Sequence, residues 1–314
     1  MGAALALASR GVGASFPNPS VGCVIVKDGR VIGRGWTASG GRPHAEAAAL
    51  AQAGTGARGA AAFVTLEPCA HASARGPSCA DSLIAAGLAR VVVAAHDPDP
   101  RTDGGGAARL RGAGIMVTSG VRAAEAERGL AGYLVRIRHA RPHITLKLGV
   151  SLDGAAAMAD GRSRWITGDR ARAAAHLERA RADLIVVGRG TWDTDAPALD
   201  VRLAGLETRS PRIGVVGRGG GLPAHVTHFA DLAALIADPA LCVLAEGGMG
   251  LAASLIGADL VDTLLLHRAP IIIGGGCTLG DIGLGDLDDA HARWHAAPIV
   301  TLGGDRIERY TRIR

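Results

Sequence analysis

The first half of the chain alternates short apolar runs with segments that favour helices. Two apolar runs, at 21–26 and 31–36, flank Asp28-Gly29, a dipeptide typical of a tight hairpin turn. Strands and helices that alternate along a chain pack as helices against a sheet, so this feature predicts an α/β domain. Its further predicted elements are a helix at His44–Ala53, a strand at Ala62–Leu66, a helix at Cys79–Ala86 and a strand at Arg90–Ala95.

A second series of elements follows a basic stretch at 133–142 (YLVRIRHARP). We interpret that stretch as a joint, since a chain of 314 residues is long enough for two domains. The boundary is expected near residue 140, which gives domains at 1–140 and 141–314. The elements predicted in the second half are strands at 142–150, 182–188, 242–248 and 261–272, helices at about Arg170–Arg181 and at Leu251–Ile256, and a final hairpin within 295–314.

The net charge of +5 raises the question of a nucleic-acid partner. Only Lys27 and Lys147 are lysines, however, and the arginines are scattered among acidic residues rather than gathered in a block. A compositional bias toward Arg explains this pattern better than a nucleic-acid-binding surface does. Arg also suits the recognition of phosphate, so the composition is consistent with a phosphorylated small substrate.

The chain contains five cysteines, an odd number, and its first residues lack the charged start and the length of a secretory leader or a membrane span. Disulfide frameworks belong to oxidising compartments. We therefore expect a cytoplasmic protein with reduced thiols. Cys23, Cys242 and Cys277 lie in apolar stretches and are expected to be structural.

Three residues in the first half form a candidate zinc site. His44 stands at the start of a predicted helix, Cys69 follows a predicted strand, and Cys79 opens the next helix. One imidazole and two thiolates are three protein ligands and leave the fourth tetrahedral position open, as in catalytic zinc sites. Helix N-termini near both cysteines would favour thiolates. Glu46, two residues after His44, is a candidate proton shuttle, and this H-x-E and P-C arrangement is the one described for zinc deaminases.

Two structural roles for these residues stay open beside the catalytic one. A His before an Ala-rich helix is commonplace, and the two cysteines could be small buried apolar residues. A zinc ion could also be purely structural, but a structural site has no use for Glu46. The joint order of strand, HAE and helix, followed by strand, EPC and helix, favours a zinc deaminase.

Beyond this centre, the sequence resembles the bifunctional deaminase/reductase family of riboflavin biosynthesis over nearly its whole length. The motifs that carry the resemblance are PNPSVGCVIVKDG (17–29), PHAE (43–46), TLEPCAH (65–71), LIAAGLARVVVAAHDPDP (83–100), KLGVSLDG (147–154), SRWITG (163–168), APALDVR (196–202), AEGGMGLAASL (245–255) and LVDTLLLHRAPIIIGG (260–275). It implies a cytidine-deaminase-like α/β/α layered domain that binds zinc. It further implies a dihydrofolate-reductase-like α/β domain that binds NADPH, and a homodimer formed through that second domain.

For the first domain, the resemblance implies hydrolytic removal of an exocyclic amine from a diaminopyrimidinone that carries a ribosylamino 5′-phosphate. The PNP motif is also a plain turn sequence, and both roles can hold together. The loop between the two cysteines is one residue longer than is usual in the family, so its substrate contacts are expected to differ. The residues assigned by the resemblance are Glu46 for catalysis, His44, Cys69 and Cys79 for zinc, and Asn18 and His71 for the substrate.

For the second domain, the resemblance implies reduction of the ribosyl group to a ribityl chain. Plain structural roles stay open here as well: Trp165 could be a core residue, Arg179 a surface charge, and two glycines after a strand an ordinary turn. The residues implied for substrate are Ser163, Arg179, Leu199, Arg202 and Glu246, with the two arginines suited to the phosphate. Those implied for NADPH are Gly149, Trp165, Thr191, Asp195 and Gly248, the last at a helix start that favours anions.

The second half departs from the family pattern in three places. It has Asp195-Ala196 where two acids are usual, Gly217-Arg218 where an Asp follows the strand, and a shortened stretch between Pro223 and Asp231. An alternative is therefore a deaminase whose second domain is a degenerate reductase and serves as a dimerisation scaffold. A nucleic-acid-editing deaminase is a further alternative, but the wide spacing of the cysteines and the second domain count against it.

Overall fold

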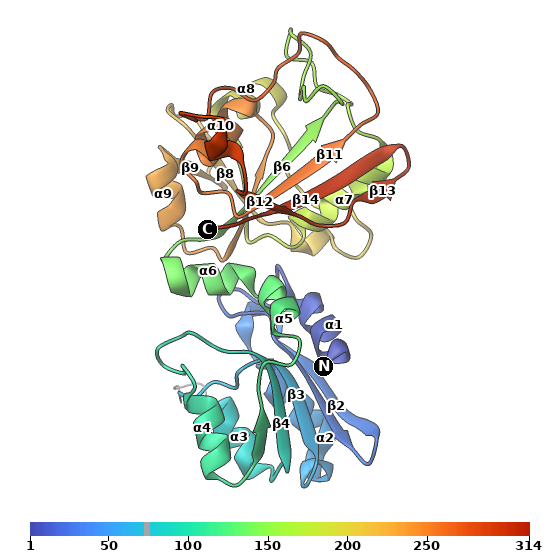
Figure 1. The fold of residues 1–314 in the computed structure, drawn as a ribbon, viewed down its shortest axis with the longest axis vertical. Coiled ribbons are helices and arrows are strands. Elements are labelled where there is room, and N and C mark those ends of the chain that lie inside the picture. Colours follow the sequence, from blue (N-terminus) through green and yellow to red (C-terminus); the bar gives the residue numbers. More distant parts are fainter. Residues whose placement is uncertain (72–75) are drawn as a thin grey trace. The chain divides into compact units, whose positions relative to one another are not determined.

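The computed structural model describes residues 1–71 and 76–314 of the chain. These residues form two compact units, Met1–Ala140 and Arg141–Arg314 (Figure 1). Each unit has its own sheet and its own buried core. Part of the long loop between the two candidate cysteine ligands, at 72–75, lies outside the described residues, and so do the substrate contacts expected there.

The first unit is built on a five-stranded sheet with the order β2-β1-β3-β4-β5. The β1–β2 and β1–β3 pairs are antiparallel, and the β3–β4 and β4–β5 pairs are parallel. The strands are β1 (Gly22–Lys27), β2 (Arg30–Trp36), β3 (Ala61–Leu66), β4 (Arg90–Ala95) and β5 (Met116–Thr118). The helices are α1 (Gly2–Gly11), α2 (Ala45–Ala53), α3 (Cys79–Ala85), α4 (Gly105–Gly112), α5 (Ala123–Gly129) and α6 (Ala131–His139).

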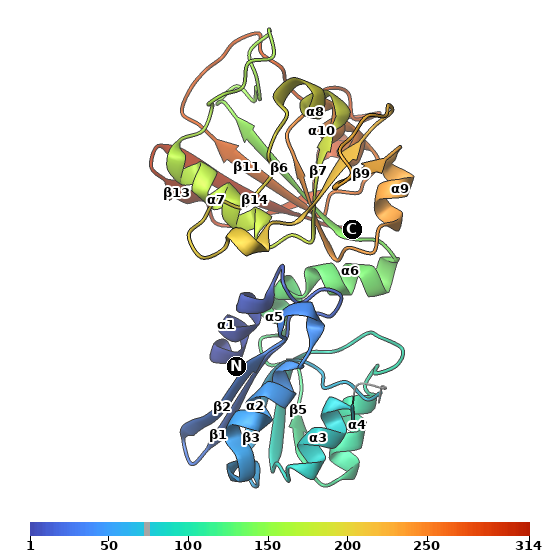
Figure 2. The same cartoon turned by 180° about the vertical axis from the view of Figure 1, so that it is seen from behind.

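Helices cover both faces of this sheet, which gives the α/β/α layers expected for the first domain (Figures 1 and 2). On one face, a Cβ added to Gly22 of β1 would meet the carbonyl oxygen of Ala4 in α1 at 1.9 Å. On the other face, a Cβ added to Gly35 of β2 would meet the carbonyl oxygen of Ala45 in α2 at 2.2 Å. Glycine at these two positions lets the helices lie directly against the strands, and α2 carries part of the candidate site.

The elements predicted in this half are present, and each of their ends lies within one residue of the expected position. The β1–β2 hairpin turns through Asp28 and Gly29, both with positive φ, as the Asp-Gly pair predicts. Most of the basic stretch interpreted as a joint forms the regular helix α6, in which Tyr133 and Leu134 are buried, and the two units divide directly after it, between Ala140 and Arg141. The basic residues gather in its last turn, where they suit the helix dipole.

The second unit contains a nine-stranded sheet with the order β12-β14-β11-β6-β10-β7-β8-β9, and β13 also pairs with β14. All neighbours from β11 to β9 are parallel, whereas β14 is antiparallel to β11, β12 and β13. The strands are β6 (His143–Val150), β7 (Leu184–Gly188), β8 (Arg212–Val216), β9 (Val226–Phe229), β10 (Cys242–Glu246), β11 (Thr263–Arg268), β12 (Trp294–Ala296), β13 (Val300–Leu302) and β14 (Asp305–Arg312). The helices are α7 (Asp169–Arg179), α8 (Arg189–Asp195), α9 (Leu232–Ala237) and α10 (Met249–Gly257).

The two faces of this sheet differ in chemistry. Ile144 and Leu146 of β6 pack with Leu255 of α10 in the apolar core. Lys147 alternates with these residues and therefore faces the other side, where it is in register with Glu246 of β10. Helix α7 covers that side and bonds to Glu246. The polar residues of the candidate reductase site therefore gather under α7.

Two expectations for the second half were wrong. The strand expected at 261–272 ends at Arg268, because Pro270 lacks the N–H that would continue the ladder. Cys277 is exposed and lies in an isolated bridge with Ala157 rather than in a strand, and three glycines at 274–276 precede it. The final hairpin is present as β13 and β14, joined through Gly303 with positive φ.

The helices of the described residues are short. The longest, α7, has 11 residues, whereas a helix that crosses a bilayer needs about 20. None of those that the structure describes is long and apolar enough to span a membrane.

Candidate functional site

Three different elements bring the predicted zinc ligands together. His44 caps the N-terminus of α2 with extended backbone, and Cys79 is the first residue of α3. Cys69 follows β3, and its Sγ accepts a hydrogen bond of 3.2 Å from the Cys79 backbone N–H. The N-terminus of α3 thus lies against both sulfur atoms, as the sequence predicts, and it favours negative charge there.

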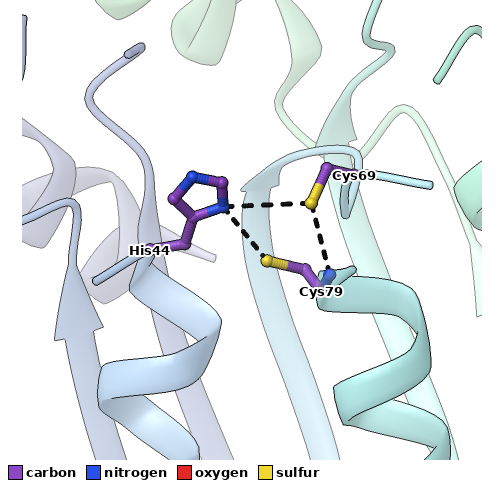
Figure 3. Close-up of side chains that lie close together, drawn as sticks. All are labelled: His44, Cys69 and Cys79. Atoms are coloured by element: carbon purple, nitrogen blue, oxygen red, sulfur yellow. Dashed lines mark hydrogen bonds between the residues drawn. The ribbon is translucent and has the colours of Figure 1, made fainter. Parts of the chain in front are cut away.

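The three side chains point toward one another (Figure 3). His44 Nδ1 lies 3.3 Å from Cys79 Sγ and 3.9 Å from Cys69 Sγ. The three ligand atoms all lie within 4.8 Å of one another. Zinc bonds of about 2.3 Å to sulfur and 2.0–2.1 Å to nitrogen, at tetrahedral angles, place N and S about 3.6 Å apart. The spacing and donor set therefore fit zinc, with small shifts of the side chains.

The pKa values of the two thiols in this cluster shift in opposite directions. A hydrogen bond from the Cys79 thiol, together with His44, lowers the pKa of Cys69 to about 4, so that Cys69 is a thiolate at neutral pH. The same hydrogen bond and burial raise the pKa of Cys79. A dication bound between them would reverse that second shift, because it stabilises a coordinating thiolate directly.

Glu46 lies in the first turn of α2, beside the cluster, and only 3% of its surface is exposed. Burial raises the pKa of Glu46 to about 7, although the nearby His44 acts in the opposite direction. A carboxyl group with such a pKa can both take up and release a proton near neutral pH, which general acid–base catalysis requires.

The two predicted substrate residues of this unit lie close to the ligands in different ways. Asn18 Nδ2 donates to the Gly41 carbonyl oxygen at 2.8 Å and lies 3.3 Å from His44 Nε2. His71 follows Cys69 by two residues, and its Nδ1 is buried with no hydrogen-bond partner among the described residues. An unpaired buried ring nitrogen is costly, so His71 is well suited to bind a polar ligand atom.

Glu67 is a buried residue of this region that the sequence analysis did not single out. Its carboxylate accepts hydrogen bonds from the backbone N–H groups of Ala107 at 2.9 Å and Gly104 at 3.2 Å. It also lies 3.1 Å from Nδ1 of His96. Glu67 therefore ties the segment that leads to Cys69 to the start of α4. The TLEPCAH motif could have pointed to Glu67, because a Glu next to Pro at the end of a strand is well placed to accept hydrogen bonds from backbone N–H groups.

Replacement of Glu67 with Ala is expected to lower the free energy of unfolding by about 1–3 kcal/mol, because two buried N–H groups lose their acceptor. Urea denaturation of the purified protein measures this change. Replacement of Glu125, an exposed residue paired with Arg122 on the surface, is the matched control and should cost less than about 1 kcal/mol. Equal losses in the two variants would contradict the role given to Glu67.

In the second unit, Glu246 and Arg179 form a buried ion pair. Nε and Nη2 of Arg179 donate to the two carboxylate oxygens at 2.8 and 2.7 Å, and Nη1 donates to the Asp200 carbonyl oxygen at 3.0 Å. Burial favours the neutral acid, but Arg179 and Lys147 outweigh it and lower the pKa of Glu246. Arg179 is therefore not the surface charge that the sequence left open, and Glu246 is its main partner.

Lys147 is a second residue that the sequence analysis passed over. A Cβ added to Gly149 would lie 3.8 Å from Nζ of Lys147, so the amine sits beside that glycine and Thr167. Burial lowers the pKa of Lys147, and the neighbouring Arg179 lowers it further, while Glu246 raises it. The sequence could have pointed to Lys147, because it lies in the KLGVSLDG motif and is one of only two lysines in the chain.

Two of the predicted NADPH residues, Thr191 and Gly248, lie next to each other at the carboxyl end of the parallel strands. Gly247 and Gly248, both with positive φ, link β10 to α10. A Cβ on Gly248 would meet Thr191 Oγ1 at 2.7 Å, so glycine keeps this turn open at the helix N-terminus. An open glycine turn at a helix start is the cradle that a pyrophosphate requires.

The other predicted residues of the second unit are spread around this edge. Trp165 is 66% exposed, so it is not a core residue, and its ring lies 4.7 Å from the guanidinium of Arg172. Arg202 is exposed and its backbone N–H lies 3.2 Å from Nδ1 of His176 on α7. Leu199 is buried, Ser163 is half-buried, and Asp195 ends α8.

Comparison with known protein families gives two matches along the chain. The model of the cytidine and deoxycytidylate deaminase zinc-binding region matches residues 1–95. The model of the RibD C-terminal domain matches residues 142–305. The first range contains the whole His–Cys–Cys cluster, and the second contains the Glu246 and Gly248 region.

Relatives match the chain over most of its length. The riboflavin biosynthesis protein RibD of Escherichia coli (strain K12) is 41% identical over 92% of both chains. Its counterpart in Mycobacterium tuberculosis (strain H37Rv) is 39% identical over 97% of this chain and 94% of the relative. Among solved structures, Acinetobacter baumannii RibD superposes with a TM-score of 0.90 at 32% identity, over 100% of this chain and 98% of that one. A deaminase/reductase of Thermotoga maritima gives 0.89 at 28% identity, over 100% and 97%.

Proposed function

The chain belongs to the family of the riboflavin biosynthesis protein RibD, and from this premise we propose a role for each residue of its two sites. It is a bifunctional deaminase and reductase that uses zinc and NADPH. We assign deamination to 1–140 and reduction to 141–314, which agrees with the ranges matched by the two family models. The presence of both domains argues against the alternative of a deaminase with a degenerate second half.

The two substrates follow from the name of the Thermotoga maritima relative, which is a diaminohydroxyphosphoribosylaminopyrimidine deaminase and 5-amino-6-(5-phosphoribosylamino)uracil reductase. We propose the same substrates for this chain. The observation that carries the proposal is the convergence of His44, Cys69 and Cys79 beside the buried Glu46.

In the deaminase site, His44, Cys69 and Cys79 would hold zinc. When bound there, zinc lowers the pKa of a coordinated water to about 7. Glu46 takes a proton from the attacking water and delivers it to the ring nitrogen, and it then delivers a proton to the departing ammonia. Asn18 and His71 hold the pyrimidine and its ribose, and the unpaired Nδ1 of His71 supports this assignment.

In the reductase site, NADPH supplies a hydride when bound in the Gly248 cradle. The overall change adds hydride to C1′ of the ribosyl group and a proton to the ring oxygen that leaves that carbon. Lys147 is the proton donor, because it is half-buried and lies beside Gly149 and Glu246. Arg179 positions Glu246, and the exposed Arg202 binds the 5′-phosphate. The remaining contacts assigned are Ser163 and Leu199 for the substrate, and Gly149, Trp165, Thr191 and Asp195 for NADPH.

The rate of reduction is expected to fall at alkaline pH, about tenfold per pH unit, because the donor must be protonated. Since the pKa of Lys147 is lowered, the fall begins below the ordinary lysine value of about 10.5. The rate of NADPH oxidation measured from about pH 6 to 10 gives this profile. Lys147→Arg keeps the charge but cannot give up its proton in this range, so the variant should lose most of the reduction at every pH. A parent profile without such a limb would contradict the assignment.

A coupled assay tests the bifunctional proposal as a whole. The zinc-loaded protein receives the diaminopyrimidine substrate, and both ammonia release and NADPH oxidation are followed. Both signals are expected, with NADPH oxidised only after deamination. Ammonia release without NADPH oxidation, also when the deaminated substrate is supplied, would support the scaffold alternative instead.

We further propose that the chain forms a homodimer through its second unit and works in the cytoplasm. Large apolar side chains on the surface of that unit, among them Ile272 at 76% and Leu287 at 74% exposed, favour a partner. The five free cysteines favour a reducing compartment. Light scattering after gel filtration tests the dimer, and a monomer mass at micromolar concentration would reject it.

A further inference from the structure

Side chains from other parts of the second unit hold the backbone at 199–202, a segment that carries two of the residues assigned to the substrate. Nη1 of Arg179 on α7 donates to the carbonyl oxygen of Asp200 at 3.0 Å. The N–H of Val201 donates to Oγ of Ser210 at 3.0 Å. Because neighbouring backbone groups are bonded to side chains outside the segment, the segment has one defined path and presents its own side chains in a fixed direction.

His176 of α7 supplies a third contact to the same segment. Its Nδ1 lies 3.2 Å from the backbone nitrogen of Arg202 and 3.1 Å from the carbonyl oxygen of Asp200. Burial and the neighbouring charge of Arg179 lower the pKa of His176, so the imidazole is neutral at pH 7. A neutral imidazole carries its proton on one nitrogen only, and therefore Nδ1 can bond to one of these two groups but not to both.

The surrounding contacts decide which of the two groups is bonded. The Asp200 carbonyl oxygen already accepts from Arg179, whereas the Arg202 N–H has no other acceptor in the part of the chain that the structure describes. With the proton of His176 on Nε2, Nδ1 accepts from the Arg202 N–H and both backbone groups have a partner. With the proton on Nδ1, the Arg202 N–H would face another N–H. The geometry therefore favours the tautomer in which Nδ1 is the acceptor.

The backbone bond matters because the Arg202 side chain has little else to hold it. It is exposed, and its Nε lies 3.4 Å from one carboxylate oxygen of Asp200, a long contact with a close neighbour in sequence. His176 and Arg179 are three residues apart on α7 and so lie on the same face of that helix. One helix face therefore holds both Glu246 and the backbone of Arg202.

We propose that His176 is a positioning residue of the reductase site, whose Nδ1 holds the backbone of Arg202 so that the guanidinium meets the 5′-phosphate of the substrate. This inference rests on the proposed reductase function and adds a residue to its substrate site. His176 acts through Arg202 and takes no part in the transfer of hydride or proton. Its loss should therefore weaken binding of the phosphate and leave the chemical step unchanged.

Three replacements of His176 in the full chain separate the acceptor from the rest of the ring. His176→Leu removes the acceptor, and its KM for the reductase substrate is expected to rise about 3- to 10-fold, the loss of one hydrogen bond, at unchanged kcat. The amide oxygen of His176→Asn can stand near the position of Nδ1 and should restore a KM close to that of the parent. The longer side chain of His176→Gln carries its amide nearer to the position of Nε2, so this variant should resemble His176→Leu.

The dephosphorylated form of the substrate shows whether the effect concerns the phosphate. For that form, kcat/KM is expected to be the same in the parent and in His176→Leu, because Arg202 has no phosphate to bind. The KM for NADPH should also be unchanged. His295→Leu, which replaces an exposed histidine on β12, is the matched control and should give the parent values throughout.

The outcomes separate this inference from the function beneath it. If His176→Leu lowers kcat/KM by the same factor for both forms of the substrate, the role of His176 is wrong and the reductase function stands. If His176→Asn has as high a KM as His176→Gln, the role of Nδ1 is wrong; this comparison decides even where His176→Leu does not fold, because both variants keep a polar amide. A parent protein that oxidises NADPH with neither form would overturn the reductase function and this inference together.

Discussion

Replacement of Glu46 with Gln is expected to slow deamination by about 10²- to 10⁴-fold while the protein keeps its zinc. The amide has almost the same size as the carboxylate, so the packing of α2 against β2 should not change. It can no longer take a proton from water or deliver one to the departing amine. Ammonia release under saturating substrate measures the loss, and metal analysis of the same sample measures zinc.

The control for this variant is Glu127→Gln, an exposed residue of α5 in the same unit. It should deaminate at the parent rate. NADPH oxidation with the deaminated substrate should also be unchanged in both variants, since Glu46 belongs to the first unit alone. Glu46→Gln protein with full zinc and the parent rate would show that another group moves the proton.

Replacement of Arg179 with Met is expected to lower the free energy of unfolding by about 3–5 kcal/mol, and to abolish reduction. Both partners of the ion pair are nearly buried, with side chains 14% and 10% exposed, so the change leaves the Glu246 carboxylate without its main partner. Denaturant unfolding of the second unit measures the cost. Arg181→Met is the matched control two residues later, where the pair between the exposed Arg181 and Glu178 at 3.5 Å is worth at most about 1 kcal/mol.

The double variant Arg179→Met with Glu246→Gln separates charge from packing. It should recover much of the lost stability, because no buried charge is left unpaired, but not the reduction.

The stability that the parent protein gains from Glu246 changes with pH in one direction. Since the folded pKa of Glu246 is lowered, its contribution to stability is present above the ordinary value and is lost as pH falls through the folded pKa. A double variant that recovers none of the lost stability would contradict this account of the pair.

Local patterns explain why the secondary structure and the metal cluster were predictable. The Asp-Gly turn, the Ala-rich helix after His44 and the apolar strands each depend on neighbours in sequence. The cluster at His44, Cys69 and Cys79 was predictable because strand, HAE and helix are followed in order by strand, EPC and helix.

Other features depend on contacts between distant segments. The bonds from Glu67 to α4 join residues 37 and 40 positions apart, and the Arg179–Glu246 pair joins residues 67 apart. Neither set of contacts produces a repeating pattern of residues from which it could have been predicted. In the structure the guanidinium of Arg179 is bonded to the carboxylate of Glu246, and the expectation that it also binds the substrate phosphate stays a prediction.

The spacing of the metal ligands along the chain links zinc binding to the folding of the first unit. His44 and Cys79 are 35 residues apart, and Cys69 lies between them at the end of β3. An ion held by all three closes two loops of the chain at once, so it acts as a reversible cross-link that the unfolded chain lacks. Bound zinc is therefore expected to stabilise this unit, so that removal of the metal with a chelator should lower its unfolding temperature as well as abolish catalysis.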